Sequence, residues 1–165
     1  MQSSSIGGFT VHALTPADLG QLRKLNELFA EAFQDRDTYC CAPPHDDYIR
    51  CLLADRHTIV LVALVAGDVA DVADVAGGLI AYELRKFEQQ RSEIYLYDLA
   101  VGEGFRRQGI ASALLERLCG IAAERGASSL FVQADYLDAP AIALYEKFGV
   151  REEVLHFDIR LIRTR

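Results

Sequence analysis

The chain has 165 residues, of which 51% are hydrophobic and 25% charged, and its formal net charge is −7. This composition predicts one globular domain over residues 1–165 and excludes a disordered chain. The acidic balance disfavours nucleic acid as a partner, because phosphate contacts need Lys and Arg, and no apolar run is long enough to predict a membrane span. Without the features of a secretory signal, the chain is expected in the cytoplasm, and its four cysteines show no metal-binding spacing, so we expect no metal.

Hydrophobic periodicity predicts alternating strands and helices along the chain. The first elements are expected to be a strand over 9–13, a helix over 19–33, a loop over 34–45 and a short helix over 46–53. Three strands are then predicted over 58–66, 78–84 and 92–101. The remaining elements are a helix over 109–125, a strand over 129–134, a helix over 140–148 and a last strand over 154–161.

Residues 65–76 form an unusual segment in which a Val-Ala-Asp triplet recurs, with Asp68, Asp71 and Asp74 at every third position. A period of three fits neither a strand nor a helix. We interpret the segment as an expanded loop between two strands. The alternative is an acidic flap over a cationic substrate.

The stretch that follows the strand over 92–101 carries the clearest functional signal. After a short loop, Arg106-x-x-Gly109-x-Ala111 opens the next helix. Free backbone N–H groups and small residues at a helix start let a phosphate approach, and Arg106 and Arg107 add positive charge. Dinucleotide and Walker patterns are absent from the stretch. The residues alone therefore leave two interpretations open, a diphosphate-binding turn or a plain helix with a glycine near its start.

Two motifs together resemble the GNAT acyltransferase superfamily. Arg106-x-x-Gly109-x-Ala111 is similar to its acetyl-CoA pyrophosphate loop, and residues 141–150 are similar to its A-x-x-L-Y-x-K-x-G-F segment, with Val150 in place of the usual aromatic. The resemblance implies an α/β fold with a mixed, partly antiparallel sheet, flanking helices and a splayed central pair of strands that admits acetyl-CoA.

The resemblance also implies a set of residues that bind acetyl-CoA. Backbone groups of Leu99, Ala100 and Val101 are expected along the pantetheine arm. The pyrophosphate is expected on Arg106, Arg107, Gln108, Gly109, Ile110, Ala111 and Ser112.

Residues 86–101, 132–136 and 151–159 resemble, more narrowly, the aminoglycoside 3-N-acetyltransferases, and Thr38-Tyr39 and Asp47-Tyr48 fit the same group. This resemblance implies acetylation of the 3-amino group of a 2-deoxystreptamine aminoglycoside, hence antibiotic resistance, and is compatible with a homodimer. A ligand with several ammonium groups needs several acids. The expected substrate-binding residues are Glu88, Glu93, Asp135, Tyr136 and Asp138.

Two residues are candidates for the chemistry itself. Alternation along the strand over 92–101 places Asp98 on the same face as Ile94 and Leu96, where an unpaired carboxylate is costly. Asp98 is the candidate general base that takes a proton from the substrate ammonium, and a structural Asp bonded to backbone N–H groups is the alternative. Tyr145 is the candidate that protonates the departing CoA thiolate, as the superfamily's tyrosine is thought to do, and a core tyrosine is the alternative.

Two rival functions stay open at this point. One is a GNAT enzyme acting on another amine, a polyamine or a protein N-terminus, which would share the acetyl-CoA site and differ at the acids. The other is a non-catalytic acetyl-CoA-binding regulator, against which the presence of Asp98 and Tyr145 counts.

Overall fold

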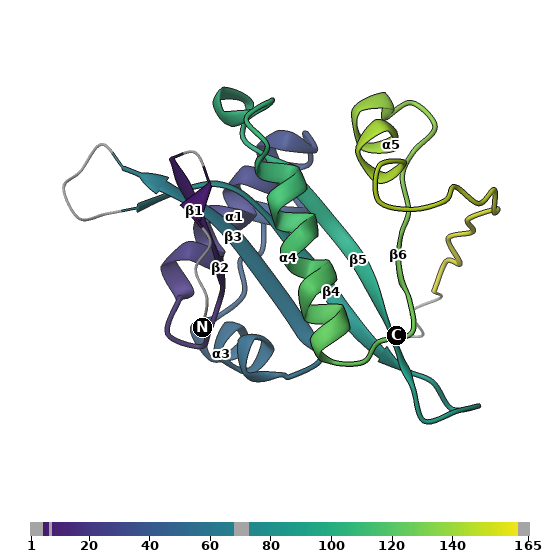
Figure 1. Cartoon of the computed structure of the whole chain (residues 1–165). Helices are drawn as coiled ribbons and strands as arrows, with labels where there is room; N and C mark the ends of the chain where they lie inside the picture. Colours follow the sequence, from purple (N-terminus) through teal and green to yellow (C-terminus); the bar gives the residue numbers. More distant parts are fainter. Residues whose placement is uncertain (1–4, 7, 68–72, 162–165) are drawn as a thin grey trace. The chain divides into compact units, whose positions relative to one another are not determined.

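The structure is a computed structural model that describes residues 5, 6, 8–67 and 73–161 (Figure 1). The chain divides into two compact units, Met1–Gln133 and Ala134–Arg165. Among the helices of the described part of the chain, none is long and apolar enough to cross a membrane.

The first unit is built on a sheet with strand order β1-β2-β3-β4-β5-β6. Neighbouring strands are antiparallel from β1 to β5, and β6 runs parallel to β5. The predicted mixed, partly antiparallel sheet is therefore confirmed. The strands are β1 (Ser5–Ile6), β2 (Phe9–Ala13), β3 (Thr58–Ala66), β4 (Ala73–Arg85), β5 (Ser92–Val101) and β6 (Leu130–Val132).

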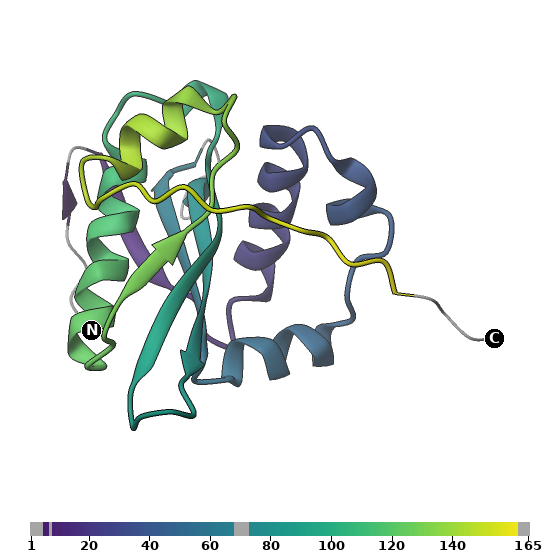
Figure 2. The ribbon, with the colours of Figure 1, turned by 90° about the vertical axis from the view of Figure 1, so that its right-hand side faces the viewer.

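Helices cover both faces of this sheet. Figure 2 shows α4 (Ile110–Glu124) on one face and α1 (Leu19–Ala32), α2 (Arg36–Cys40) and α3 (Asp46–Ala54) on the other. Each long helix turns one apolar stripe inward, as residues three or four apart share a face. The buried residues of α4 are Ile110, Leu114, Leu115, Leu118, Ile121 and Ala122.

The core under α1 joins this helix to the middle of the sheet. Leu22, Leu25 and Phe29 of α1 pack with Val60 of β3 and Ala100 of β5. Gly78 of β4 allows this approach, since a Cβ there would lie 2.6 Å from Leu25 Cδ1. The close packing of α1 against the end of β5 positions the candidate site.

Two predictions over the first unit need correction. The expected loop over 34–45 contains the short helix α2, whose start is stabilised because Asp35 accepts a hydrogen bond from the Thr38 N–H at 3.0 Å. The strands β3 and β4 extend into the expected expanded loop over 65–76, because residues 65–66 and 73–76 belong to the sheet and Ala66 pairs with Ala73. Residues 68–72 of the expected loop, with Asp68 and Asp71, lie outside the described residues.

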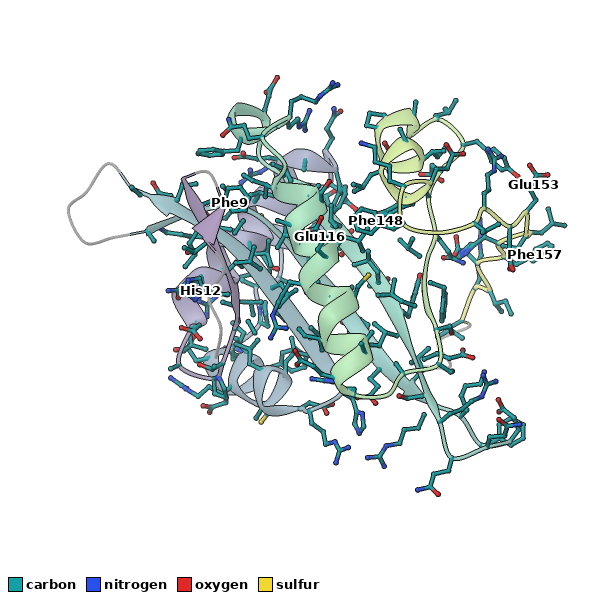
Figure 3. The ribbon with its side chains drawn as sticks, viewed as in Figure 1. Phe9, His12, Glu116, Phe148, Glu153 and Phe157 are labelled. Carbon is teal, nitrogen blue, oxygen red and sulfur yellow. The ribbon has the colours of Figure 1, made fainter. Side chains whose placement is uncertain are left out.

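The second unit contains α5 (Ala139–Tyr145), a shorter helix than the predicted one over 140–148. The predicted last strand over 154–161 is wrong, because these residues have no strand pairing and no regular secondary structure. Figure 3 labels Phe157 on this irregular stretch, and the Phe157 side chain is 76% exposed. Alternating apolar residues show that a strand here could bury one face, but a strand forms only where a neighbouring strand is available to pair with it.

Candidate active site

The first feature of the site is an open edge on β5. β6 pairs with β5 only at Ile94, Tyr95 and Leu96. Beyond Leu96, no strand among the described residues pairs with that side of β5, while β4 continues on the other side to Val101. The backbone of Leu99, Ala100 and Val101 therefore lies along the splayed part of the β5–β6 pair.

A β-bulge in β5 decides which way Asp98 points. Leu96 pairs with Ala81 of β4, but Asp98 pairs with the preceding residue Ile80, so Tyr97 is an extra residue. The extra residue shifts the alternation of side chains along β5. Asp98 therefore lies on the same face as Ala100, which belongs to the core under α1. The predicted face of Asp98, shared with Leu96, is therefore wrong.

Asp98 lies half-buried beside a tyrosine of α2. The Tyr39 hydroxyl donates a hydrogen bond of 2.9 Å to Asp98 Oδ2. Burial raises the pKa of the Asp98 carboxyl above its ordinary value, and the hydrogen bond from Tyr39 opposes this rise. A half-buried carboxylate with a raised pKa is suited to accept a proton.

Further tyrosines surround this carboxylate on the same face of the sheet. The Tyr97 ring lies edge-on to Tyr82 at 5.9 Å and to Tyr95 at 5.6 Å between centroids. Burial is the main cause that raises the pKa of both Tyr82 and Tyr95, and the charge of Asp98 adds to each rise. These rings give Asp98 an aromatic rather than an ionic surrounding.

The loop after β5 leads to the start of α4. Gly109, the residue before the helix, has φ +84°, and no side chain caps the helix start. A Cβ at Gly109 would meet no atom within 4 Å, so the space above the helix start is open. Arg107 is also in the left-handed region, at φ 65°, and Arg106 Nε donates to the Val101 carbonyl at 3.3 Å.

This arrangement fits a diphosphate. The first backbone N–H groups of a helix have no partner within the helix and carry the positive end of its dipole. Here Gly109 leaves the space in front of these N–H groups open, and the exposed Arg106 and Arg107 precede it in the chain. The side chains of Arg106, Arg107 and Gln108 and the start of α4 at Gly109, Ile110, Ala111 and Ser112 could thus hold the pyrophosphate of a CoA.

The predicted substrate acids Glu88 and Glu93 lie at the far end of β5. They form an ion-paired cluster with Lys86 and Arg91, in which Arg91 Nη2 is 2.8 Å from Glu88 Oε1 and Lys86 Nζ is 3.4 Å from Glu93 Oε2. Five residues of strand, about 16 Å, separate Glu93 from Asp98. The structure does not bring these two acids together with Asp98.

The other predicted site residues belong to the second unit. Asp138 caps α5, because its carboxylate accepts the Ala141 N–H at 3.0 Å, and its own N–H donates to the Asp135 carbonyl at 2.9 Å. Tyr136 is exposed, with the Arg151 guanidinium 5.6 Å above its ring. Tyr145 is the half-buried last residue of α5.

One residue of the site had no role assigned from the sequence. The sequence marks Tyr39 only as part of a resemblance, in a segment expected to be a loop. A usable signal was Asp35, three residues before Thr38, since Asp is a preferred residue at a helix start. Among the described residues, no group of three or more potential metal-ligating side chains comes together.

Comparison with known proteins bears on the whole arrangement. The profile described as the acetyltransferase (GNAT) family matches residues 22–150. A solved aminoglycoside acetyltransferase from an uncultured soil metagenomic sample is 50% identical, with 94% of this chain and 99% of that chain covered and a TM-score of 0.87. Another from such a sample, in complex with sisomicin, is 28% identical, with 93% and 97% covered and a TM-score of 0.83.

Curated relatives match a smaller part of the chain. The [ribosomal protein bS18]-alanine N-acetyltransferase of Escherichia coli (strain K12) is 38% identical over 63 residues. These are 38% of this chain and 43% of that protein, so the match spans less than half of this relative's length.

Proposed function

The chain belongs to the acetyltransferase (GNAT) family, and on this premise we propose that it transfers the acetyl group of acetyl-CoA to the 3-amino group of a 2-deoxystreptamine aminoglycoside. The observation that carries the proposal is the position of Asp98. This carboxylate lies three residues before the end of β5, beside the open strand edge and a short loop away from the uncapped start of α4.

Acetyl-CoA would bind along these two features. The backbone of Leu99, Ala100 and Val101 offers hydrogen-bonding groups to an extended pantetheine arm, in place of the strand partner that β6 does not supply. The start of α4 receives the pyrophosphate. One co-substrate placed in this way has its thioester near the bulge that carries Asp98.

The reaction then needs one base and one acid. Asp98 takes a proton from the substrate ammonium, and the free amine attacks the acetyl carbonyl carbon. The C–N bond forms, the C–S bond breaks, and Tyr145 donates a proton to the departing thiolate. The products are the N-acetylated amine and CoA.

The substrate class is proposed from charge and similarity. An acidic protein attracts a polycation, and the two solved proteins that are 50% and 28% identical to this chain are aminoglycoside acetyltransferases. The remaining ammonium groups would be met by Asp135, Tyr136 and Asp138. Glu88 and Glu93 are weaker candidates, because Lys86 and Arg91 already balance their charges.

A second candidate function has an observation of its own. The match to the ribosomal-protein alanine N-acetyltransferase favours acetylation of a protein N-terminus. It shares the acetyl-CoA site and differs only in the acceptor amine. The two candidates therefore predict the same co-substrate and different acceptors.

The deciding experiment measures CoA release from acetyl-CoA with a panel of acceptors. The panel holds sisomicin, a kanamycin-type aminoglycoside, a polyamine and a peptide with an N-terminal alanine. We expect the highest kcat/KM with an aminoglycoside and a product acetylated at the 3-amino group, identified by NMR. A preference for the peptide or the polyamine, or acetylation at another amine, would contradict the proposal.

A further inference from the structure

We propose that Tyr39 is a positioning residue for Asp98, which holds one carboxylate oxygen by a hydrogen bond so that the other stays available to the substrate amine. The inference rests on the proposed function, in which Asp98 is the base. It starts from the contact of 2.9 Å between the Tyr39 hydroxyl and Asp98 Oδ2.

Tyr39 is itself held firmly. Its ring packs at 5.8 Å from the rings of both Phe29 and Phe33, and Phe29 is fully buried in α1. Aromatic contacts of this kind fix a ring while leaving its polar tip free to bond. Because α2 begins at the Asp35 cap, only a short helical turn separates the packed end of α1 from the phenol. The hydroxyl thus has a fixed place at the end of β5.

A fixed donor has two consequences for a carboxylate. It directs Oδ2 toward α2, so that Oδ1 is the oxygen left for a proton from the substrate. It also stabilises the charged form, against the effect of burial on the pKa of Asp98. Burial raises the pKa of Tyr39 well above its ordinary value, so the phenol keeps its proton and remains a donor at neutral pH.

The other titratable groups around Asp98 do not supply this stabilisation. They are the phenols Tyr82 of β4 and Tyr95 and Tyr97 of β5, with Tyr48 of α3 acting on Tyr82. Burial raises the pKa of Tyr82 and Tyr95, so these two are neutral donors as well, but they bond elsewhere or pack as rings. Tyr95, for example, donates to Gln133 Oε1 at 3.0 Å.

The test is the pH profile of Tyr39→Phe, which keeps the packed ring and removes the hydroxyl. We expect the acidic limb of kcat/KM to move to higher pH by about one unit, because the lost hydrogen bond favoured the charged carboxylate. The matched control is Tyr97→Phe, which removes a phenol beside Asp98 that lies outside this hydrogen bond. In the control, the acidic limb should stay at its wild-type position.

A direct titration separates this inference from the proposed function. The carboxyl carbon of Asp98 is followed by NMR in protein labelled with ¹³C-aspartate, and its signal is assigned by its loss in Asp98→Asn. We expect a higher pKa for Asp98 in Tyr39→Phe than in the wild type, whatever the acceptor amine proves to be. An unchanged titration in Tyr39→Phe, in a protein that melts like the wild type, would overturn the role of Tyr39.

Discussion

The first half of β5, residues 92–96, has strand or backbone partners on both sides. Among the described residues, the second half, residues 97–101, has a strand partner only in β4. Ile94 and Leu96 in the first half are fully buried, while the second half holds the bulge and the half-buried Asp98. The first half therefore builds the core. The proposed chemistry lies where the regular pairing stops, because only there are backbone groups and a carboxylate left over.

Among the variants of these two halves of β5, Asp98→Asn in the second half is expected to have the largest effect. The change keeps the shape of the side chain and removes the proposed base, so turnover should fall by about 10²–10⁴-fold at neutral pH. Stability should change in the other direction. Since the folded state raises the pKa of Asp98, the stability linked to this group is lost as pH rises, and a neutral Asn avoids that loss.

Steady-state turnover and thermal unfolding at pH 7 check both parts of this prediction. The melting temperature of Asp98→Asn should equal or exceed that of the wild type. Wild-type turnover at neutral pH, or a protein that unfolds at a clearly lower temperature, would mean that Asp98 is structural.

Leu96→Ala tests the first half of the strand. The side chain is fully buried, and its truncation leaves a cavity, so the free energy of unfolding should fall by about 2–5 kcal/mol. Denaturant unfolding measures the loss. The kcat of the molecules that remain folded should change far less than in Asp98→Asn. An equal loss of kcat would contradict the proposal that the first half builds the core and the second half carries the chemistry.

Glu83 of β4, which pairs with Ile94 in the first half of β5, allows a test through the pH dependence of stability. Burial raises the pKa of Glu83, but hydrogen bonds from Ser92 and Arg125 and the nearby positive charges outweigh it and hold the pKa below its ordinary value of 4.5. Such a group contributes stability above that range, and the contribution is lost as pH falls through the folded-state pKa.

We therefore expect Glu83→Gln to cost about 1–3 kcal/mol at pH 7 and to flatten the decline in melting temperature between pH 5 and pH 3. Melting curves across this range, recorded for the wild type and the variant, make the comparison. An equally steep decline in both proteins would show that Glu83 is not responsible.

Gly109→Val acts on the loop that follows the second half. A β-branched residue at φ +84° costs about 1–2 kcal/mol, which displaces the first N–H groups of α4 and should weaken acetyl-CoA binding by about tenfold. Gly104→Ala is the matched control, since a Cβ there is also free of contacts but the residue has no positive φ. Equal calorimetric affinities of the two variants for acetyl-CoA would contradict the assignment of the pyrophosphate to this helix start.

Local pattern predicted β5 from its first to its last residue, and it predicted the loop and helix that follow. It did not predict the direction of Asp98, because one extra residue at Tyr97 reverses the alternation without altering the strand-like composition. Whether a strand carries a bulge depends on its partner, in this case the register of Ile80 and Ala81 in β4. That information is not local to the strand.

The same limit explains the two other differences. Residues 154–161 alternate as a strand should, yet no edge among the described residues pairs with them. Tyr39 lies in a segment with too little periodicity to predict a helix, and its importance comes from a contact with Asp98, 59 positions away. Residues that act through such distant contacts are visible only when the chain is folded.

An exposed strand edge is a template for other chains, because its N–H and C=O groups will pair with any extended backbone. Beyond Leu96, one side of β5 has no strand partner among the described residues, so its N–H and C=O groups are of this kind. A pantetheine arm lying along it would occupy the same groups. Under the proposed function, bound acetyl-CoA would thus cover backbone groups that could otherwise pair with another extended chain.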